Sequence, residues 1–312
     1  MNYIINLNKP SDITSRQAVT KVKQLLGADK AGHTGTLDPL ATGILLICLN
    51  EATKVTRFLL DMDKTYKAKM KFGERTDTCD ATGRIIEKKD ISSLTEFEIL
   101  NAVAMFRGRI RQKPPMYSAV KVRGETLYKL ARRGIEIERP ERVVEIYDIK
   151  VLGINFPYCD LMISCSKGTY VRSLCDDMGR SLGVGAHIVA LERQTIGFFD
   201  IKDTVSFEDL LVYKNEKFFC DGEKHSGVCR AALCAFEEKS FCSIDFALSG
   251  LKEIFLGERD YKRARQGIPI ISNNIGNLHE NDFIRMKGPS GNLFGIGRAC
   301  SDVIRIERIL NL

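Results

Sequence analysis

The sequence predicts a protein of mixed α/β class with one large and one small domain. A length of 312 residues leaves room for two hydrophobic cores, and a content of 44% hydrophobic and 28% charged residues is typical of soluble globular proteins. Helical and strand periodicities both occur. Apolar residues recur at helical spacing over Ser15–Leu26, whereas they alternate with lysines over residues 66–72.

The composition also predicts a compartment. No apolar run approaches the roughly 20 residues that span a bilayer, and residues 1–9 lack the basic start of a signal peptide. The ten cysteines are scattered without a Cys-x-x-Cys pair, which is typical of a reducing compartment rather than of a disulfide framework. We therefore expect a cytoplasmic protein that does not bind membranes.

The first expected elements are a short strand over residues 3–7 and a helix over Ser15–Leu26. Ser15 is the expected N-cap of this helix, because its hydroxyl can accept a hydrogen bond from a free backbone N–H. Gly27 is expected to end it, because glycine readily adopts the left-handed conformation that closes helices.

A glycine-rich loop over residues 31–44 follows and leads into an apolar strand, residues 44–49. Pro39 disfavours the helical conformation for Asp38, so the Asp38 carboxylate is expected on a shaped loop. The glycine spacing fits neither a P-loop nor a dinucleotide-binding fingerprint, which disfavours nucleotide hydrolysis. A purely structural turn is the other interpretation of this pattern.

Residues 51–63 are then expected to be helical, and residues 66–72 form a strand that Tyr66 opens, with one apolar and one cationic face. A polar turn follows over residues 75–83. Its two aspartates, Asp77 and Asp80, lack the glycine and terminal glutamate of a calcium loop, so we interpret this turn as structural.

Positive charge is concentrated in residues 107–134, which we call the basic arm. This segment follows a helix opened by a capping box at residues 95–98. It contains nine lysines and arginines against one acid, so its formal charge of +8 exceeds the +7 of the whole chain. Tyr117 and Tyr128 lie among these cations, a combination suited to stacking on bases and neutralising phosphates. The basic arm is therefore predicted to bind nucleic acid.

Two strands are expected over residues 143–152 and 160–165, before a second loop, residues 166–172, that enters a helix. Arg172 lies near the start of this helix, where its side chain can face a site. Alternatively, Arg172 forms an exposed pair with Asp176 one turn later, worth a few tenths of a kcal/mol. Further on, the cysteines and His225 within residues 220–242 lack the spacing of a zinc module, so no metal is expected there and a zinc site is the minority alternative.

Two of these stretches closely resemble TruB-type tRNA pseudouridine synthases, namely residues 31–44 and residues 166–179. The resemblance implies a pseudouridine-synthase catalytic domain with an antiparallel-rich sheet over residues 1–212, in which the basic arm is an RNA-clasping insertion. Residues 213–242 are then a linker or insertion. Residues 243–312 resemble the small β-rich PUA-like domain that ends many of these enzymes.

The resemblance also implies a role for individual residues. Asp38 is the implied nucleophile, and Tyr66 stacks on a target base that is flipped out of the RNA. Arg172 is expected to pair with Asp38 and keep it ionised, and Lys9 supports the loop. Tyr170 and Leu191 are expected to line the nucleotide pocket, and His33 to support the flipped nucleotide or the structure of the loop. Arg109, Arg111, Arg132 and Arg133 are expected to contact the RNA backbone.

The implied reaction converts uridine 55 in the T-loop of tRNA to pseudouridine, with no net oxidation, transfer or hydrolysis. We therefore expect no cofactor and no metal, the T-arm of tRNA as partner, and no obligatory protein partner. A glycoside hydrolase is disfavoured because no second acid stands in a loop comparable to that of Asp38. The main alternative is a non-catalytic tRNA-binding or RNA-folding protein, which the presence of Asp38 disfavours.

Overall fold

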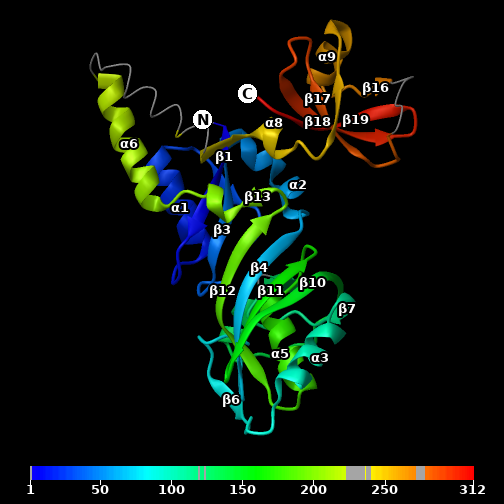
Figure 1. The fold of residues 1–312 in the computed structure, drawn as a ribbon. Coiled ribbons are helices and arrows are strands. Elements are labelled where there is room, and N and C mark those ends of the chain that lie inside the picture. The colour runs from blue at the N-terminus through cyan, green and yellow to red at the C-terminus, as the bar shows by residue number, and fades with distance from the viewer. Residues whose placement is uncertain (1, 119, 123, 223–235, 237–239, 272–277) are drawn as a thin grey trace.

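The computed structural model describes residues 2–118, 120–122, 124–222, 236, 240–271 and 278–312. Within these residues, one large and one small sheet account for most strands (Figure 1). Helices and strands are interleaved along the chain, which confirms the mixed α/β class. No helix in the described part of the chain is both long and apolar enough to cross a membrane.

The large sheet has ten strands, eight of them in the order β14-β1-β3-β12-β4-β11-β10-β7, while β2 pairs with β3 and β13 with β12. Every pair is antiparallel except β12 with β3, which confirms the antiparallel-rich sheet. The strands are β1 (Tyr3–Lys9), β2 (Ala31–His33), β3 (Thr42–Leu49), β4 (Lys64–Phe72), β7 (Gly108–Gln112), β10 (Arg142–Asn155), β11 (Tyr158–Cys165), β12 (Ala186–Ile196), β13 (Phe199–Asp200) and β14 (Phe241–Ser243).

Four of the helices pack near the large sheet, in two pairs. α3 and α5 pack against its β4, β10 and β12 strands, while α1 and α6 contact one another near β3 (Figure 1). The helical segments are α1 (Ser15–Leu26), η1 (Asn50–Val55), α2 (Thr56–Leu60), α3 (Glu96–Met105), α4 (Leu127–Arg132), α5 (Val171–Ser181), η2 (Ile201–Asp203), α6 (Phe207–Gly222), α8 (Ile244–Ala247) and α9 (Glu258–Arg265).

The small sheet has the order β15-β17-β18-β19-β16. It confirms a small β-rich unit in the last part of the chain. Its strands are β15 (Lys252–Phe255), β16 (Ile270–Ile271), β17 (Phe283–Lys287), β18 (Leu293–Cys300) and β19 (Val303–Ile309). Two hairpins stand apart from both sheets, β5 (Glu74–Thr76) with β6 (Ile85–Lys88), and β8 (Lys121–Val122) with β9 (Glu125–Thr126).

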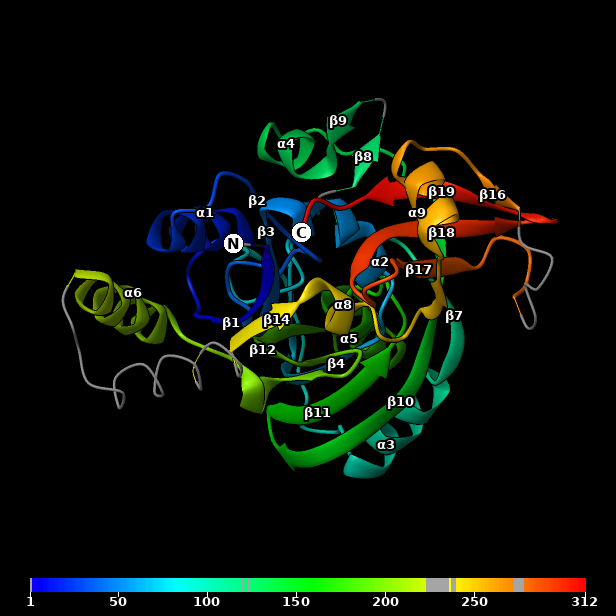
Figure 2. The same cartoon turned by 90° about the horizontal axis from the view of Figure 1, so that it is seen from above.

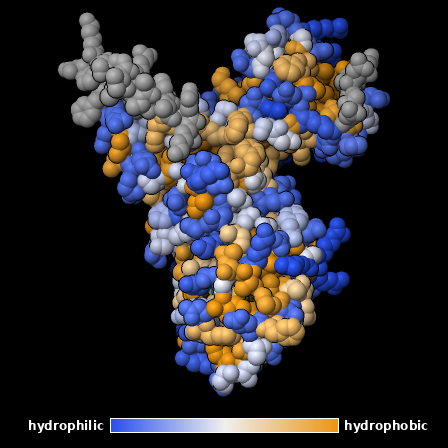
Figure 3. All heavy atoms as spheres, viewed as in Figure 1, coloured by the Kyte–Doolittle hydropathy of each residue, from blue (hydrophilic) through white to orange (hydrophobic). Residues whose placement is uncertain are grey.

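The two sheets share a hydrophobic core because the strands β1 and β3 are buried on both faces. One face joins the main core with α1, whereas the other faces the small sheet. Leu293, Ile296 and Leu310 of the small sheet belong to the same cluster as Ile4 and Ile44. Figure 3 shows hydrophobic side chains gathered where the small sheet meets the body, beneath α8.

Several expected boundaries need correction, among them the ends of the strands expected over 3–7, 143–152 and 160–165, which are longer by one to three residues at an end. The residue that caps α1 is Thr14, whose hydroxyl accepts from the N–H of Gln17, while the buried Ser15 bonds to a distant loop instead. Residues 51–63 are helical only to Leu60, first as a 3-10 turn. β4 begins at Lys64 rather than Tyr66. By contrast, Gly27 ends α1 with φ 63°, as predicted.

Candidate active site

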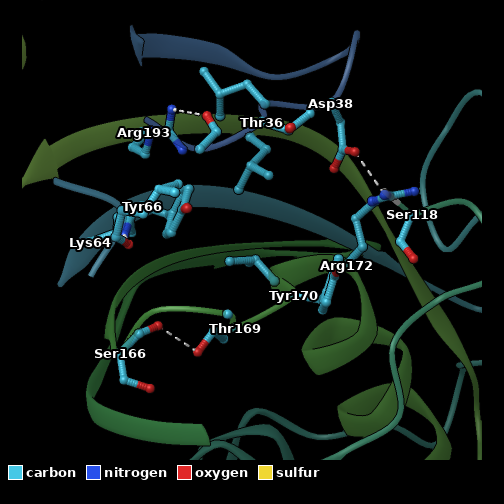
Figure 4. A pocket seen from close by; sticks show the side chains of 16 residues that line it. Thr36, Asp38, Lys64, Tyr66, Ser118, Ser166, Thr169, Tyr170, Arg172 and Arg193 are labelled. Carbon is cyan, nitrogen blue, oxygen red and sulfur yellow. Dashed lines mark hydrogen bonds and ion pairs between the residues drawn. The ribbon is translucent and has the colours of Figure 1, made fainter. Parts of the chain in front are cut away.

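A pocket of about 270 Å³ opens where β4 and β12 meet two loops, one between β2 and β3 and the other before α5 (Figure 4). Five residues named from the sequence line it, namely Asp38, Tyr66, Tyr170, Arg172 and Leu191. The remaining lining residues are Gly35, Thr36, Leu37, Leu60, Lys64, Ser118, Ser166, Gly168, Thr169, Val171 and Arg193. The structure thus gathers residues that are more than 150 positions apart in the sequence, as the numbers of Asp38 and Leu191 show.

The loop that carries Asp38 is held from below by side chains. Ser15 accepts a hydrogen bond from the N–H of Leu37 at 2.8 Å and donates to its carbonyl at 3.0 Å. The ammonium group of Lys9, which is fully buried, donates to the carbonyls of Pro10, Ile13 and Pro39 at 2.7, 2.9 and 3.2 Å. These bonds fix the loop on both sides of Asp38.

Asp38 and Arg172 point toward one another at one side of the pocket (Figure 4). The Nη2 atom of Arg172 donates to Oδ1 of Asp38 at 2.7 Å, and to the carbonyl of Tyr117 at 2.9 Å. The Asp38 side chain is 31% exposed, whereas that of Arg172 is only 5% exposed. The predicted pairing is therefore confirmed, and the Asp38 carboxylate is held while it stays open to the pocket.

The alternative pairing of Arg172 with Asp176 is wrong, because Asp176 bonds to Arg75 at 2.8 Å and to Arg180 at 2.9 Å. The second carboxylate on Arg172 is Asp80, whose Oδ2 lies 3.1 Å from Nη1. Interpreting the turn at 75–83 as structural therefore missed a residue of the site. Asp80 does not line the pocket, since its side chain is 5% exposed behind the guanidinium.

The charge state of Asp38 results from opposing effects. Burial raises the pKa of Asp38 above its ordinary value, Arg172 lowers it by charge and by hydrogen bonding, and the Asp80 carboxylate raises it again. The net effect is a raised pKa of Asp38. Arg172 therefore favours the ionised form of Asp38 only in part. Because 31% of the Asp38 side chain is exposed, solvent offsets part of the free-energy cost of ionising this buried carboxyl group.

Tyr66 forms part of the pocket floor beside Arg193 (Figure 4). Tyr66 is 8% exposed and shares a side-chain hydrogen bond with Arg193. Burial raises the pKa of Tyr66, and the Arg193 charge opposes this shift. Arg193 itself is 1% exposed and donates to the carbonyls of Ile44 at 2.8 Å and Gly35 at 3.2 Å. The tyrosine ring is therefore held by the same guanidinium that holds the start of the Asp38 loop.

Two predicted residues lie outside the pocket lining. His33 ends β2, and its Nδ1 atom is buried without a partner in the described part of the chain. Burial and the nearby Arg193 charge lower the pKa of His33, so its neutral form is favoured. Lys9 lies behind the loop rather than in the pocket, and burial lowers its pKa to about 8.

The four arginines predicted to contact RNA backbone also lie away from the pocket. Arg109 and Arg111 are exposed on β7, the edge strand of the large sheet. Arg132 lies over the ring of Tyr128 at 4.6 Å, and Arg133 pairs with Glu125 at 2.6 Å. Figure 2 shows α4, β8 and β9 outside the large sheet. The basic arm thus starts as a sheet strand and continues as a projecting hairpin and helix.

The site also contains residues that the sequence analysis missed. Lys64, Ser118 and Arg193 line the pocket, and Gln112 bonds to the backbone of Tyr170. The Lys64 ammonium group donates to the carbonyls of Leu60 and Met62, and burial lowers its pKa to about 8. The sequence offers one signal for these residues. Each is a polar residue at a strand position where an apolar residue is expected, or in a loop next to such a strand.

The possible zinc ligands cannot be compared with the structure in the same way. His225, Cys229 and Cys234 lie outside the described residues, as does the side chain of Cys220. Among described residues, no group of three or more potential ligands lies close enough together to hold a metal ion. The expectation of no metal stays a prediction.

Comparison with known proteins supplies the family. Residues 23–171 match the TruB family pseudouridylate synthase (N terminal domain), and residues 172–224 match the tRNA pseudouridylate synthase B C-terminal domain. The chain is 38% identical to tRNA pseudouridine synthase B of Clostridium tetani over 99% of this chain and 100% of that protein. It is 39% identical to the protein of that name from Mannheimia succiniciproducens, over 98% of this chain and 95% of that protein.

Solved structures agree with this result. A Cbf5-Nop10-Gar1 complex contains a chain with a TM-score of 0.75 and 26% identity, which covers 98% of this chain and 84% of that chain. A structure of an H/ACA RNP bound to a substrate RNA gives a TM-score of 0.74 at 23% identity, over 99% of this chain and 85% of that chain, and shows likeness of fold. The chain therefore belongs to the TruB family of pseudouridylate synthases.

Proposed function

We propose that this protein converts uridine 55 in the T-loop of tRNA to pseudouridine, with Asp38 as the nucleophile. The observation that supports this proposal best is the position of Asp38, which is open to the pocket, bonded to Arg172 and in the same lining as Tyr66. The family supports pseudouridine formation, and the names of the relatives support tRNA as the substrate.

The chemistry requires a carboxylate, a place for the detached base and exclusion of bulk water. Asp38 forms a covalent bond to the nucleotide, and that bond breaks again before the product leaves, which regenerates the carboxylate and divides the isomerisation into easier steps. The bond between N1 and C1′ breaks, the base turns, and C5 bonds to C1′. C5 loses its proton and N1 gains one, so atoms balance without a cofactor.

The target nucleotide has to leave the RNA stack to reach this pocket. Tyr66 supplies the aromatic surface for the flipped base, and Tyr170 and Leu191 bound the space around it. Arg172 holds the carboxylate of Asp38 toward the pocket. His33 supports the nucleotide or the loop that carries Asp38, and the exposed cations of the basic arm contact the RNA backbone.

A glycoside hydrolase needs two carboxylates that both reach the scissile bond. Asp80 does not meet this requirement, because its Oδ1 atom is bonded to Thr78 and Thr82 and its Oδ2 atom to Arg172. The geometry therefore favours Asp38 as the one reactive carboxylate, with Asp80 held in place by its hydrogen bonds. The proposal also includes a cytoplasmic location and action without an obligatory protein partner.

The test uses a tRNA transcript that carries tritium at C5 of its uridines. Wild-type protein should release tritium in proportion to pseudouridine formed, because C5 loses its hydrogen only when it bonds to C1′. A matched transcript with cytidine at position 55 should release none. Release that persists with this transcript would contradict the assigned position, and no release from any tRNA would favour a binding protein without catalysis.

A further inference from the structure

The two faces of the edge strand β7 carry different kinds of side chain. Arg109 and Arg111 are exposed on one face, whereas Ile110 and Gln112 point to the other, as the alternation of a strand requires. Gln112 is only 2% exposed, although the next residues of the basic arm lead away from the sheet. A buried carboxamide needs partners for both its donor and its acceptor.

Those partners belong to the pocket. The Nε2 atom of Gln112 donates to the carbonyl of Tyr170 at 2.9 Å, and the N–H of Tyr170 donates to Oε1 at 2.7 Å. Tyr170 is the N-cap residue of α5, and its own side chain makes no capping bond. Gln112, which lies on β7, therefore provides hydrogen-bond partners for the backbone of Tyr170. These two bonds fix the position where α5 begins.

Two further contacts join the same regions. The carbonyl of Tyr117 accepts from Nη2 of Arg172 at 2.9 Å, and that nitrogen also donates to Asp38. The carbonyl of Lys113 accepts from the hydroxyl of Ser173 at 3.4 Å. The residues at the start of α5 are thus bonded to the first part of the basic arm, and Gln112 makes the only two-point contact among these bonds in the described residues.

We propose that Gln112 is a positioning residue for the reaction. By fixing the backbone of Tyr170, it sets the first turn of α5, so that Arg172 meets Asp38 and the Tyr170 side chain bounds the pocket. The inference rests on the proposed function and divides β7 between two tasks. The face with Arg109 and Arg111 contacts RNA, and the opposite face aligns the catalytic groups.

Gln112→Met keeps the length of the side chain but removes both hydrogen bonds. We expect kcat for tritium release to fall by about 10- to 100-fold, because a misplacement near 1 Å has an effect of that size. KM and the Kd for tRNA should stay within about threefold of wild type, since phosphate contacts dominate RNA affinity. Arg111→Gln on the opposite face is the contrast, and it should weaken tRNA binding instead.

Gln112→Glu provides a second readout that a loss of packing does not produce. An ionised carboxylate accepts from the N–H of Tyr170 but cannot donate to its carbonyl, whereas a protonated carboxyl group does both. The ratio of its kcat to that of wild type, measured at each pH, should therefore rise as the pH is lowered. If Gln112→Met does not fold, the pH dependence of this ratio tests whether Gln112 positions Tyr170.

An active wild type together with an unchanged kcat in Gln112→Met overturns this inference alone. A fall in tRNA affinity without a fall in kcat, or a pH-independent ratio for Gln112→Glu, also overturns it. Absence of tritium release from wild-type protein has a different meaning, because it overturns the proposed function and this inference together.

Discussion

Arg172 donates from Nη1 to Oδ2 of Asp80 across 3.1 Å, and both side chains are 5% exposed. Asp80 is itself immobilised by the hydroxyls of Thr78 and Thr82 at 2.7 and 2.6 Å. One half of the guanidinium is therefore bound to a fixed buried carboxylate, while the other half holds Asp38. This arrangement orients Arg172 before any RNA is bound.

Asp80→Asn tests this orientation. We expect kcat to fall by about tenfold or more, because the variant lacks the charged hydrogen bond to Arg172. Asp80 raises the pKa of Asp38, so its neutralisation should lower that pKa and move the acid limb of the kcat profile to lower pH. Asp77→Asn, in the same turn, is the control that should leave this limb in place. An unshifted limb in Asp80→Asn would contradict the coupling.

Asp38→Asn should abolish tritium release while tRNA binding survives, because the nucleophile is removed but the phosphate contacts remain. Burial raises the pKa of folded Asp38. A group with a raised folded pKa gives stability that is lost as the pH rises through that pKa, so ionised Asp38 destabilises the fold at neutral pH. The variant should therefore melt at the same temperature as wild type or higher. A comparable rate of tritium release would show that Asp38 is not the nucleophile.

Replacing Arg109, Arg111, Arg132 and Arg133 together by alanine should flatten the dependence of log affinity for tRNA on log salt. Removal of one cation that touches a phosphate lowers this slope by up to about 0.7 to 0.9. Arg133 should contribute least, since it already pairs with Glu125. The matched control replaces four exposed cations outside the basic arm, namely Arg84, Lys88, Lys150 and Lys202. Equal slopes for the two variants would refute the predicted binding of RNA by the basic arm.

Lys9→Met should reduce both stability and turnover. It removes three hydrogen bonds to the carbonyls of Pro10, Ile13 and Pro39 and leaves those carbonyls without this donor. The expected loss is about 1–3 kcal/mol of unfolding free energy, measured by urea denaturation. A lower kcat should accompany it, because Pro39 directly follows Asp38. Normal kcat in a folded Lys9→Met protein would show that this support is unnecessary.

Several features could be predicted from the sequence because they depend on local rules. Gly27 closes α1, and residues 66–72 alternate between core and surface as expected. The contact between Arg172 and Asp38 was expected from the family resemblance rather than from spacing. The roles assigned to His33, Tyr170 and Leu191 stay predictions, as do the domain boundaries at residues 212 and 242.

The missed residues share a physical cause. Asp80 lies in a turn with ordinary turn composition, and only its distance from Arg172, far along the chain, reveals its part in the site. Gln112 and Arg193 occupy inward strand positions, where a sequence shows a polar residue but not the partner that satisfies it. Ser15 was expected to cap a helix, yet burial brings its hydroxyl to Leu37 instead.

The pairing of β14 with β1 affects how the chain folds during synthesis. Residues 241–243 pair with residues 3–5 of β1 and cover its edge there, although more than 230 residues separate β1 from β14 in the sequence. That part of the edge stays open until β14 has been made, whereas Val205 bridges Leu7 farther along the same edge. Exposed strand edges favour pairing with other chains. Chains that end before β14 should therefore aggregate, even though every residue of the pocket has been synthesised.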